Sequence, residues 1–414
     1  MDREIIRRHL VDCIEGGRLR KVFGQEQVEL ICGELVAQLE REMVNCTGEE
    51  QLRLLISTLV GRLGPPITQM ELFVTFNCNL RCSYCFVEKK NTQDRMGLSL
   101  AEKAVDLLVR ESSGVKTLTL LFFGGEPLLE FGLIQRIIDY ANSRYPEKDF
   151  HYSATTNGTL LTGPILQQCK DYRLNLLLSI DGDSEAHDRF RRTKNGKGSF
   201  GMVADKLTLL KEYQPWVGAR MTVHPALVSH LSQGIEHLHS LGVNQFLISP
   251  AEGGDCAKQW SEELWTLYEH QLRKVRRFCS EVRDRGGHIR VSTLEECKPI
   301  DASKRLWGCR AARNTVAVSP TGNLYPCSRF IGMQDIRDGF KLGHVTSGMH
   351  AHSVRKSFLE FELACRKQCA ECASAEYCIG GCPAINVEET GSIFIPAKTQ
   401  CASAAMSKRL ATIP

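Results

Sequence analysis

The amino-acid sequence predicts an α/β fold built on parallel strands and followed by a cysteine-rich region. From residue 70 to about residue 250, six short strand-like runs alternate with helical patterns. Strands that alternate with helices form parallel sheets through right-handed crossovers. Six such units are fewer than the eight of a closed barrel. Of the 18 cysteines, 11 lie in two stretches, 78–85 and 309–401.

The predicted organisation has four parts. Apolar residues such as Leu52, Leu55 and Leu59 recur at helical spacing before the break at Gly64-Pro65-Pro66, so the first part is expected to be a helical segment. A barrel-like domain, a helical bridge and a cysteine-rich domain are expected to follow. The expected boundaries are 1–66, 67–255, 256–300 and 301–414.

Periodicity places the individual elements of the barrel-like domain. Helical patterns fill the intervals between its strands, for example at Leu100–Glu111 and Phe200–Tyr213, and a longer one lies near 260–286. The six expected strands are 70–76, 117–123, 150–156, 174–180, 217–223 and 244–248.

Length and charge narrow the class of protein. At 414 residues the chain is long enough for two or three domains, and a net charge of +4 is too small to indicate a nucleic-acid partner. No apolar run reaches membrane-spanning length, and the start of the chain lacks the apolar core of a signal peptide, so we expect a cytoplasmic protein without membrane contact. In that setting, 18 cysteines indicate metal ligation rather than disulfides.

The cysteines directly after the first expected strand are the strongest chemical signal. Cys78, Cys82 and Cys85 form a Cys-x3-Cys-x2-Cys run. Three thiolates at this spacing can hold three irons of a [4Fe–4S] cluster and leave the fourth iron open to bind and cleave a small molecule. A zinc site would need a fourth ligand close by, and the flanking residues supply none.

This spacing resembles the signature of the radical SAM superfamily, and Gly124-Gly125-Glu126-Pro127 resembles the glycine-rich strand end of that family. The resemblance implies an open, TIM-like (β/α)6 partial barrel. It also implies S-adenosylmethionine as a cofactor, chelated by the open iron and cleaved by one electron to a 5′-deoxyadenosyl radical. The backbone of the glycine-rich segment would contact the methionine ammonium, since glycine permits close approach.

Further cofactor contacts are expected at the carboxyl ends of the strands, where barrel enzymes place their chemistry. The resemblance puts Ser179 and Asp181 near the ribose and carboxylate of S-adenosylmethionine, and Asn157 near its methionyl end. Arg220 is a candidate partner for the carboxylate, and Tyr84 is a candidate to lie against the adenine. Two alternatives stay open: Asn157 and the glycine after it are also a common turn pair, and Arg220 could form an ordinary ion pair.

The cysteines after residue 300 closely resemble the SPASM extension of radical SAM enzymes, which holds two auxiliary [4Fe–4S] clusters. Their ligands would interleave in a small domain with little apolar core, so we expect its folding to need metal. The alternative is a pair of structural zinc knuckles that use the same thiolates. The resemblance implies Cys369, Cys372, Cys378 and Cys401 for the outer cluster, and Cys309, Cys327 and Cys382 for the inner one.

The inner set of cysteines lacks a fourth member. Sulfatase-maturing relatives carry another cysteine a few residues before the position of Cys309, where this chain has none in 300–304. Cys297 or Cys365 could replace it, or the inner cluster keeps an open iron that a substrate thiolate can bind. The open site is slightly favoured.

Two further segments depart from a simple assignment. In the sulfatase-maturing relatives an aspartate base follows the cysteine matching Cys327, whereas this chain has Ser328, which cannot act as a base near neutral pH without an activating partner. His187-Asp188-x2-Arg191 resembles a recurrent segment of this branch, but the sequence assigns it no role. The sequence therefore names no catalytic residue.

The resemblance as a whole, over about 70–414, implies a peptide maturase. Such enzymes install thioether or carbon–carbon crosslinks in ribosomally made precursor peptides, which bind directly or through a leader, and they take electrons from a reductant such as flavodoxin or ferredoxin. The alternatives are a sulfatase-type maturase that oxidises Cys or Ser to formylglycine and, more distantly, a non-catalytic iron–sulfur electron carrier. The substrate motif, the bond formed, the consumption or regeneration of S-adenosylmethionine, the oligomeric state and the role of 1–66 stay open.

Overall fold

A computed structural model describes residues 65–87, 93–214, 216–300, 309–333, 337–359 and 367–412 of the chain. The helical segment expected at 1–66 lies outside the described residues, apart from its last two. The described residues begin at the predicted break, and the first strand starts only a few residues later.

Six parallel strands form the centre of the fold, as the sequence predicted. They lie side by side in chain order, so each pairs with the strand before it and the strand after it. The predicted and observed bounds agree to within two residues at each end. The strands are β1 (Gln69–Thr75), β2 (Thr117–Gly124), β3 (Asp149–Thr156), β4 (Leu174–Ser179), β5 (Gly218–Val223) and β6 (Gln245–Pro250).

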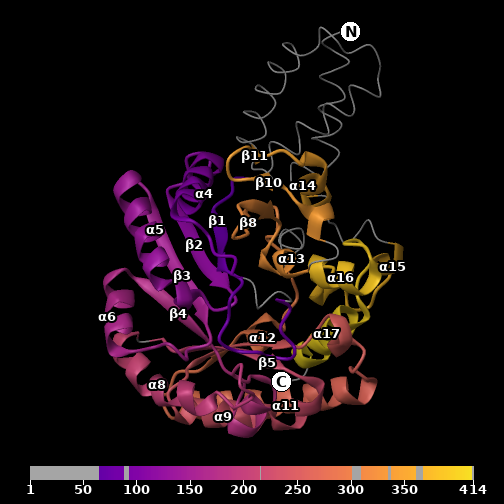
Figure 1. The fold of residues 1–414 in the computed structure, drawn as a ribbon. Coiled ribbons are helices and arrows are strands. Elements are labelled where there is room, and N and C mark those ends of the chain that lie inside the picture. Colours follow the sequence, from indigo (N-terminus) through magenta and orange to yellow (C-terminus); the bar gives the residue numbers. More distant parts are fainter. Residues whose placement is uncertain are drawn as a thin grey trace.

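Helices connect these strands and cover one face of the sheet. Figure 1 shows the sheet as a curved layer with the connecting helices along its outer side. Local capping helps to begin them: Thr162 accepts a hydrogen bond from the backbone of Ile165, and Ser261 accepts one from Leu264. The main connecting helices are α4 (Leu98–Glu111), α5 (Phe131–Arg144), α6 (Gly163–Asp171), α8 (Phe200–Tyr213), α9 (Leu231–Ser240) and α11 (Glu262–Asp284).

Shorter helical segments lie in the connections. α7 follows β4 and becomes important for the site below. Two 3-10 turns follow β2 and β5. These segments are η2 (Pro127–Glu130), α7 (Ser184–Phe190), η3 (Pro225–His230), α10 (Gly254–Ala257) and α12 (Ser292–Glu296).

The two faces of the sheet differ in side-chain exposure because successive residues of a strand point to opposite faces. Met70, Leu72, Leu120 and Leu176 are fully or nearly fully buried and belong to the hydrophobic core. Their neighbours form a row across β1 to β4 in which no residue is fully buried: Glu71, Leu121, Ser153 and Asn175. The second face of the sheet is therefore the one whose side chains are available to form a functional site.

The sheet extends at both edges beyond the predicted strands. β7 (Arg290–Val291) pairs parallel with β6, and β8 (Thr315–Val318) pairs parallel with β1. β9 (Asn323–Tyr325), β10 (Gly343–His344) and β11 (Gly348–Met349) continue from β8 in antiparallel fashion. The order β11-β10-β9-β8-β1 to β7 does not close into a barrel among the described residues. One sheet thus runs across the predicted boundary at 300–301.

The cysteine-rich region packs against both the sheet and the bridge helix. In Figure 1 its elements, orange to yellow, lie across from the helix-covered side of the curved sheet. Arg276 of α11 donates to the carbonyl of Leu410 (2.8 Å), and Arg409 pairs with Glu269 (2.6 Å). The helices of this region are α13 (Ser328–Gly332), η5 (Arg337–Phe340), α14 (His352–Leu359), α15 (Lys367–Ala370), η7 (Ala375–Tyr377), α16 (Pro383–Thr390) and α17 (Lys398–Ala411).

The described helices differ from membrane-spanning helices. None in the described part of the chain combines the length and the apolar character needed to cross a bilayer.

Candidate functional site

The Cys78–Cys85 loop leaves the carboxyl end of β1. Its thiols lie close enough that Cys82 and Cys85 act electrostatically on Cys78, whose sulfur also accepts a hydrogen bond from the backbone of Leu80 (3.4 Å). Burial, helped by the nearby negative groups Glu126, Cys82 and Cys85, raises the pKa of the Cys78 thiol to about 11. A thiolate here at neutral pH therefore needs a compensating positive charge, which a bound metal supplies.

The Gly124-Gly125 pair packs directly against the start of this loop. A Cβ on Gly124 would lie 2.4 Å from the carbonyl oxygen of Thr75, and one on Gly125 would lie 2.2 Å from that of Asn77. Gly125 and Glu126 also donate backbone hydrogen bonds to Thr75 and Asn77 (2.8 and 2.9 Å). The pair therefore permits a close approach of backbone to backbone, which holds the end of β2 against the cysteine loop.

The Glu126 side chain is buried and fully engaged inside the protein. Its oxygens accept hydrogen bonds from the Thr156 hydroxyl (2.7 Å) and from the backbones of Asn157 (2.7 Å) and Leu128 (3.0 Å). Burial nevertheless raises the pKa of Glu126 to about 7. Pro127 begins the 3-10 turn η2 directly after it. The carboxyl thus joins the ends of β2 and β3.

Asn157 is buried beside the first cysteine. Its amide nitrogen donates to the side chain of Asn79 (2.8 Å) and lies 3.9 Å from the sulfur of Cys78. Its amide oxygen accepts from Thr159, from both the backbone (3.0 Å) and the hydroxyl (2.6 Å). The structure therefore brings this predicted residue to the cysteine loop, within a local turn.

Ser179 and Arg220 face each other across β4 and β5. They are register partners; Ser179 is the last residue of β4, whereas Arg220 lies in the middle of β5. Ser179 is partly exposed and Arg220 is exposed, so both lie on the accessible face of the sheet. The Arg220 guanidinium acts electrostatically on the buried hydroxyl of Tyr268.

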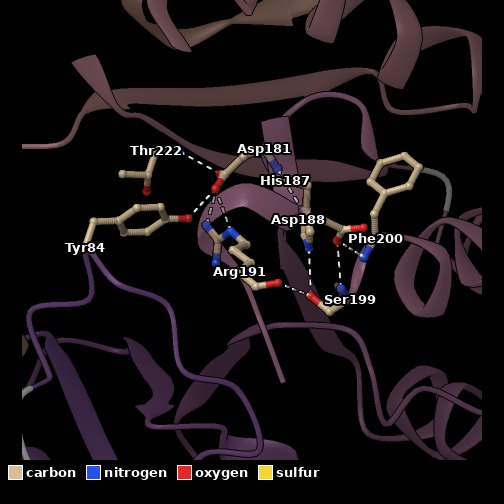
Figure 2. A network of polar contacts seen from close by, with 8 residues as sticks. All are labelled: Tyr84, Asp181, His187, Asp188, Arg191, Ser199, Phe200 and Thr222. Carbon is tan, nitrogen blue, oxygen red and sulfur yellow. Dashed lines mark hydrogen bonds and ion pairs between the residues drawn. The ribbon is translucent and has the colours of Figure 1, made fainter. Parts of the chain in front are cut away.

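Asp181, which follows β4, lies at the centre of a buried polar network (Figure 2). Its two oxygens accept a forked pair of hydrogen bonds from Arg191 (2.7 and 3.0 Å), and it also accepts from the Tyr84 hydroxyl and the Thr222 backbone (2.9 Å). Burial acts to raise the pKa of Asp181, but Arg191 outweighs it, so that pKa lies below its usual range. The side chains of Asp181 and Arg191 are only 7% and 8% exposed.

Tyr84 therefore contacts the protein itself at the point where the sequence expected a cofactor contact. The Arg191 guanidinium lies over its ring at 5.3 Å from the centroid. Burial raises the pKa of its hydroxyl well above the usual value. Tyr84 stands between Cys82 and Cys85, so this contact ties the cysteine loop to the segment after α7.

Cys309, Cys327 and Cys382 come together in the cysteine-rich region. Burial raises the pKa of Cys309 to about 11, with Cys382 adding to the effect. Burial also raises the pKa of Cys327 well above its usual value, and Glu71, Cys382 and Cys309 raise it further. Three thiols from separate segments thus lie within electrostatic reach of one another, as the resemblance implied for the inner cluster.

Glu71 is a residue that sequence reasoning missed. It lies on β1, and its carboxylate accepts a hydrogen bond from the backbone of Ser328 (2.7 Å) as well as one from the Ser328 side chain. Burial raises the pKa of Glu71. A charged residue inside the apolar run 70–76 was the signal that could have identified it.

Cys369, Cys372 and Cys378 follow one another along turns, and Cys401 lies on α17. Cys372 donates its backbone N–H to Cys369 (3.2 Å), and the sulfur of Cys378 accepts from the Gly380 backbone (3.2 Å). Lys408 of α17 donates to the carbonyl of Ala373 (2.7 Å), which holds this loop to the helix.

Among the candidates for a fourth ligand of the inner cluster, only Cys297 is described. Its thiol donates to the carbonyl of Thr293 (2.9 Å) and acts electrostatically on Tyr268. Cys365 lies outside the described residues.

The donor sets fit iron–sulfur clusters by their chemistry, because each main group brings three buried or half-buried thiols into electrostatic contact. In the described ranges, no three Cys, His, Asp or Glu side chains converge on one point as the ligands of a single ion do. The cysteines of a cubane cluster instead bind separate irons. Phe86, just after Cys85, carries the Arg329 guanidinium over its ring at 5.6 Å, so the two cysteine groups lie in neighbouring segments.

Comparison with known proteins identifies the central domain. Residues 72–228 match the family model described as the radical SAM superfamily. An uncharacterised protein of Methanocaldococcus jannaschii is 36% identical over 42% of this chain, and the matching part spans only 58% of that relative. The radical SAM cyclopropyl synthase TigE of Paramaledivibacter caminithermalis is 22% identical over 82% of this chain and 72% of its own. A cysteine-type anaerobic sulfatase-maturating enzyme of Clostridium novyi is 23% identical over 74% and 85%.

Solved structures share the fold. The structure described as native anSMEcpe with bound AdoMet and Cp18Cys peptide has a TM-score of 0.69 at 18% identity, and the match covers 84% of this chain and 97% of that one. Streptococcus suis SuiB bound to the precursor peptide SuiA has a TM-score of 0.57 at 15% identity and covers 91% and 89%. Residues 72–228 thus form a radical SAM domain, and the chain shares its fold with the solved structures.

Proposed function

We propose that this protein is a radical SAM/SPASM peptide maturase, which installs an oxidative crosslink in a ribosomally made precursor peptide. The observation that carries the proposal is the placement of two cysteine groups. The Cys78–Cys85 loop lies at the carboxyl end of β1, and Cys327 follows a strand hairpin that adds to the other side of β1. A substrate bound beside the carboxyl end of β1 would lie near both cysteine groups.

Cys78, Cys82 and Cys85 would hold a [4Fe–4S] cluster with one open iron. When bound, that cluster supplies the electron that cleaves S-adenosylmethionine to a 5′-deoxyadenosyl radical. This chain's residues would bind and orient the cofactor: the 124–127 segment at the methionine ammonium, Arg220 at the carboxylate, and Ser179 at the accessible face of β4. Fixing these contacts beforehand decides which substrate hydrogen lies within reach.

Crosslinking removes two hydrogens from the peptide. One leaves as a hydrogen atom to the 5′-deoxyadenosyl radical, which becomes 5′-deoxyadenosine. The second leaves as a proton and an electron when the carbon radical couples to a cysteine sulfur or a second carbon. Cys309, Cys327 and Cys382 would hold an auxiliary cluster suited to accept that electron, with a second at Cys369, Cys372, Cys378 and Cys401.

The precursor peptide is the proposed partner because a protein of similar fold is described bound to one. TigE is named as a cyclopropyl synthase, and SuiB is described in complex with its precursor peptide. A flavodoxin or ferredoxin is the proposed source of the electrons.

A second candidate function is that of a sulfatase-type maturase, which oxidises Cys or Ser to formylglycine. Similarity to the Clostridium novyi enzyme supports it. The Glu71–Ser328 contact also supports it. Ser328 stands where the sulfatase-maturing relatives carry an aspartate base, and the Glu71 carboxylate lies beside that position.

The test is an anaerobic incubation of the iron-reconstituted protein with a reductant, S-adenosylmethionine and the small peptide encoded beside its gene, read by tandem mass spectrometry. We expect a loss of two hydrogens per modification, with backbone fragments missing between the two joined residues. Omission of S-adenosylmethionine is the control.

Other outcomes have distinct meanings. An aldehyde in a sulfatase-derived peptide would establish the second candidate function instead. Abundant 5′-deoxyadenosine with both peptides unchanged would keep the radical chemistry and reject both substrate classes.

A further inference from the structure

The segment 187–191, which the sequence singled out without a role, lies against the cysteine loop. The backbone of Arg81 donates to the carbonyl of Arg192 (2.6 Å), and that of Ser83 donates to the carbonyl of Phe190 (3.2 Å). A bridge between Leu80 and Thr193 continues the pairing. Main-chain bonds on both sides of Arg191 thus hold the loop that carries Cys82.

The Arg191 side chain adds a second connection to the same loop. Its guanidinium forks onto Asp181 and lies over the ring of Tyr84, while the Tyr84 hydroxyl donates to the same carboxylate. Figure 2 shows the three side chains converging from the cysteine loop, the end of β4 and the segment after α7. Because the pair is buried, its geometry is fixed more firmly than that of a surface ion pair.

A further set of hydrogen bonds holds the segment 187–191 in place. His187 shares a hydrogen bond with the hydroxyl of Ser199 (2.9 Å), and that hydroxyl donates to the carbonyl of Arg191 (2.9 Å). Asp188 accepts from the backbones of Ser199 and Phe200, both at 2.7 Å. The motif residues His187, Asp188 and Arg191 therefore act as one unit that anchors the segment to the start of α8.

We propose that Arg191 is a positioning residue for the cluster loop, acting through Asp181 and Tyr84 to set the orientation of Cys82 and Cys85. This inference rests on the proposed radical SAM function, because it concerns how that cluster is presented to S-adenosylmethionine. In this role Arg191 touches neither the cofactor nor the substrate. It fixes the loop between two cluster ligands against the carboxyl end of β4.

The experiment compares Arg191→Lys with wild type after anaerobic reconstitution. Lysine keeps the charge that balances Asp181 but loses the fork and the planar contact with Tyr84. The measurements are the rate of 5′-deoxyadenosine formation, the KM for S-adenosylmethionine, and the EPR spectrum of the reduced cluster with and without S-adenosylmethionine. The matched control is Arg192→Lys, whose exposed side chain donates only to the carbonyls of Asp188 and Gly196.

We expect Arg191→Lys to form 5′-deoxyadenosine about 10- to 100-fold more slowly per cluster, as a small misplacement of reacting groups does. Its KM should change less, and the EPR change on adding S-adenosylmethionine should be reduced. Arg192→Lys should match wild type. A purely structural role would lower thermal stability and leave the EPR change and the rate per cluster as in wild type, and that result would overturn the proposal.

A second variant keeps the inference testable should Arg191→Lys not fold. Tyr84→Phe retains the ring and removes only the hydroxyl that reaches Asp181, and it should alter the EPR spectrum in the same direction with a smaller loss of rate. Wild-type spectra and rates in Tyr84→Phe would then overturn the proposal. A wild-type protein that forms no 5′-deoxyadenosine would reject the proposed function alone. The EPR spectra of the reduced cluster without S-adenosylmethionine would still test whether the variants change the cysteine loop.

Discussion

The two cysteine groups of this protein are built in opposite ways. Cys78, Cys82 and Cys85 lie within one short loop, and their proximity is already present in the chain. Cys309, Cys327 and Cys382 come from the segment before β8, from the N-cap of α13 and from the N-cap of α16, and they meet only when the region folds. The orientation of the first group therefore depends on the barrel-like domain. The second group forms only when the whole cysteine-rich region folds.

The supports of the two groups differ in the same sense. The first loop is held by main-chain bonds to the segment after α7 and by the glycine pair after β2. In the second group, the backbone of Cys382 donates to the side chain of Gln400 (2.7 Å), the neighbour of Cys401. Loss of one of the two clusters proposed for the C-terminal region should therefore disturb the other, whereas the first loop should be independent of both.

Cys82→Ala is expected to have the largest effect. Removal of a ligand from the first loop should abolish 5′-deoxyadenosine formation, because three thiolates are the minimum that leaves only one iron open. Iron content should fall by one cluster while the C-terminal clusters remain. Cys169→Ala, which removes a buried cysteine of α6 away from both groups, is the control. Appreciable 5′-deoxyadenosine from Cys82→Ala would reject the assignment of this loop.

Cys378→Ala should separate the two groups functionally. We expect this variant to retain part of its 5′-deoxyadenosine formation, because the first loop is intact, but to lose the crosslinked peptide. Both products can be measured in one reaction by chromatography and mass spectrometry. An unchanged yield of crosslinked peptide would show that the outer cysteines have no part in the reaction.

Arg355→Met tests the connection between the two regions. Arg355 of α14 is 3% exposed and donates to the carbonyls of Pro65, Ala312 and Arg313 at 2.6 to 3.1 Å. The variant leaves buried carbonyls without donors, so the free energy of unfolding should fall by roughly 3 to 5 kcal/mol. Anaerobic denaturant unfolding measures it, with Ser357→Ala on the exposed side of α14 as control. Equal stability of the two variants would contradict this role.

Glu252→Gln should have the smallest effect, visible as a change in pH dependence. Burial raises the pKa of Glu252 to about 7, so between about pH 4.5 and pH 7 the folded protein holds a proton that the unfolded chain releases. The unfolding free energy of wild type should therefore fall, relative to the variant, by at most about 3 kcal/mol as the pH rises through that window. Parallel stability curves for the two proteins would show that Glu252 does not titrate in this range.

Local patterns in the sequence predicted the centre of the fold well. Each strand from β1 to β6 lies in a short strand-like run, and each connecting helix has its own periodic pattern, so both types of element could be located without knowledge of the rest. α8 was predicted at its observed bounds, Phe200–Tyr213. The strands β8 to β11 were missed because they are two to four residues long and too short to show an alternating pattern.

The site was predictable where a residue's role follows from its spacing and not where it follows from a distant partner. The spacing of Cys78, Cys82 and Cys85 was sufficient to group them. In contrast, the pairing of Asp181 with Arg191, ten residues later, depends on the turn made by α7, and the contact of Glu71 with Ser328 joins positions 257 residues apart. No local pattern contains such information.

The parallel pairing of β8 with β1 has a consequence for synthesis on the ribosome. β1 is synthesised before the other described strands, yet its partner on that side lies at Thr315–Val318, some 240 residues later in the chain. Until then the backbone groups along that edge of β1 have no strand partner among the described residues, and such an edge can pair with another chain. The nascent chain therefore exposes an unpaired strand edge until residue 315 emerges, and its need for chaperones should be greatest before that point.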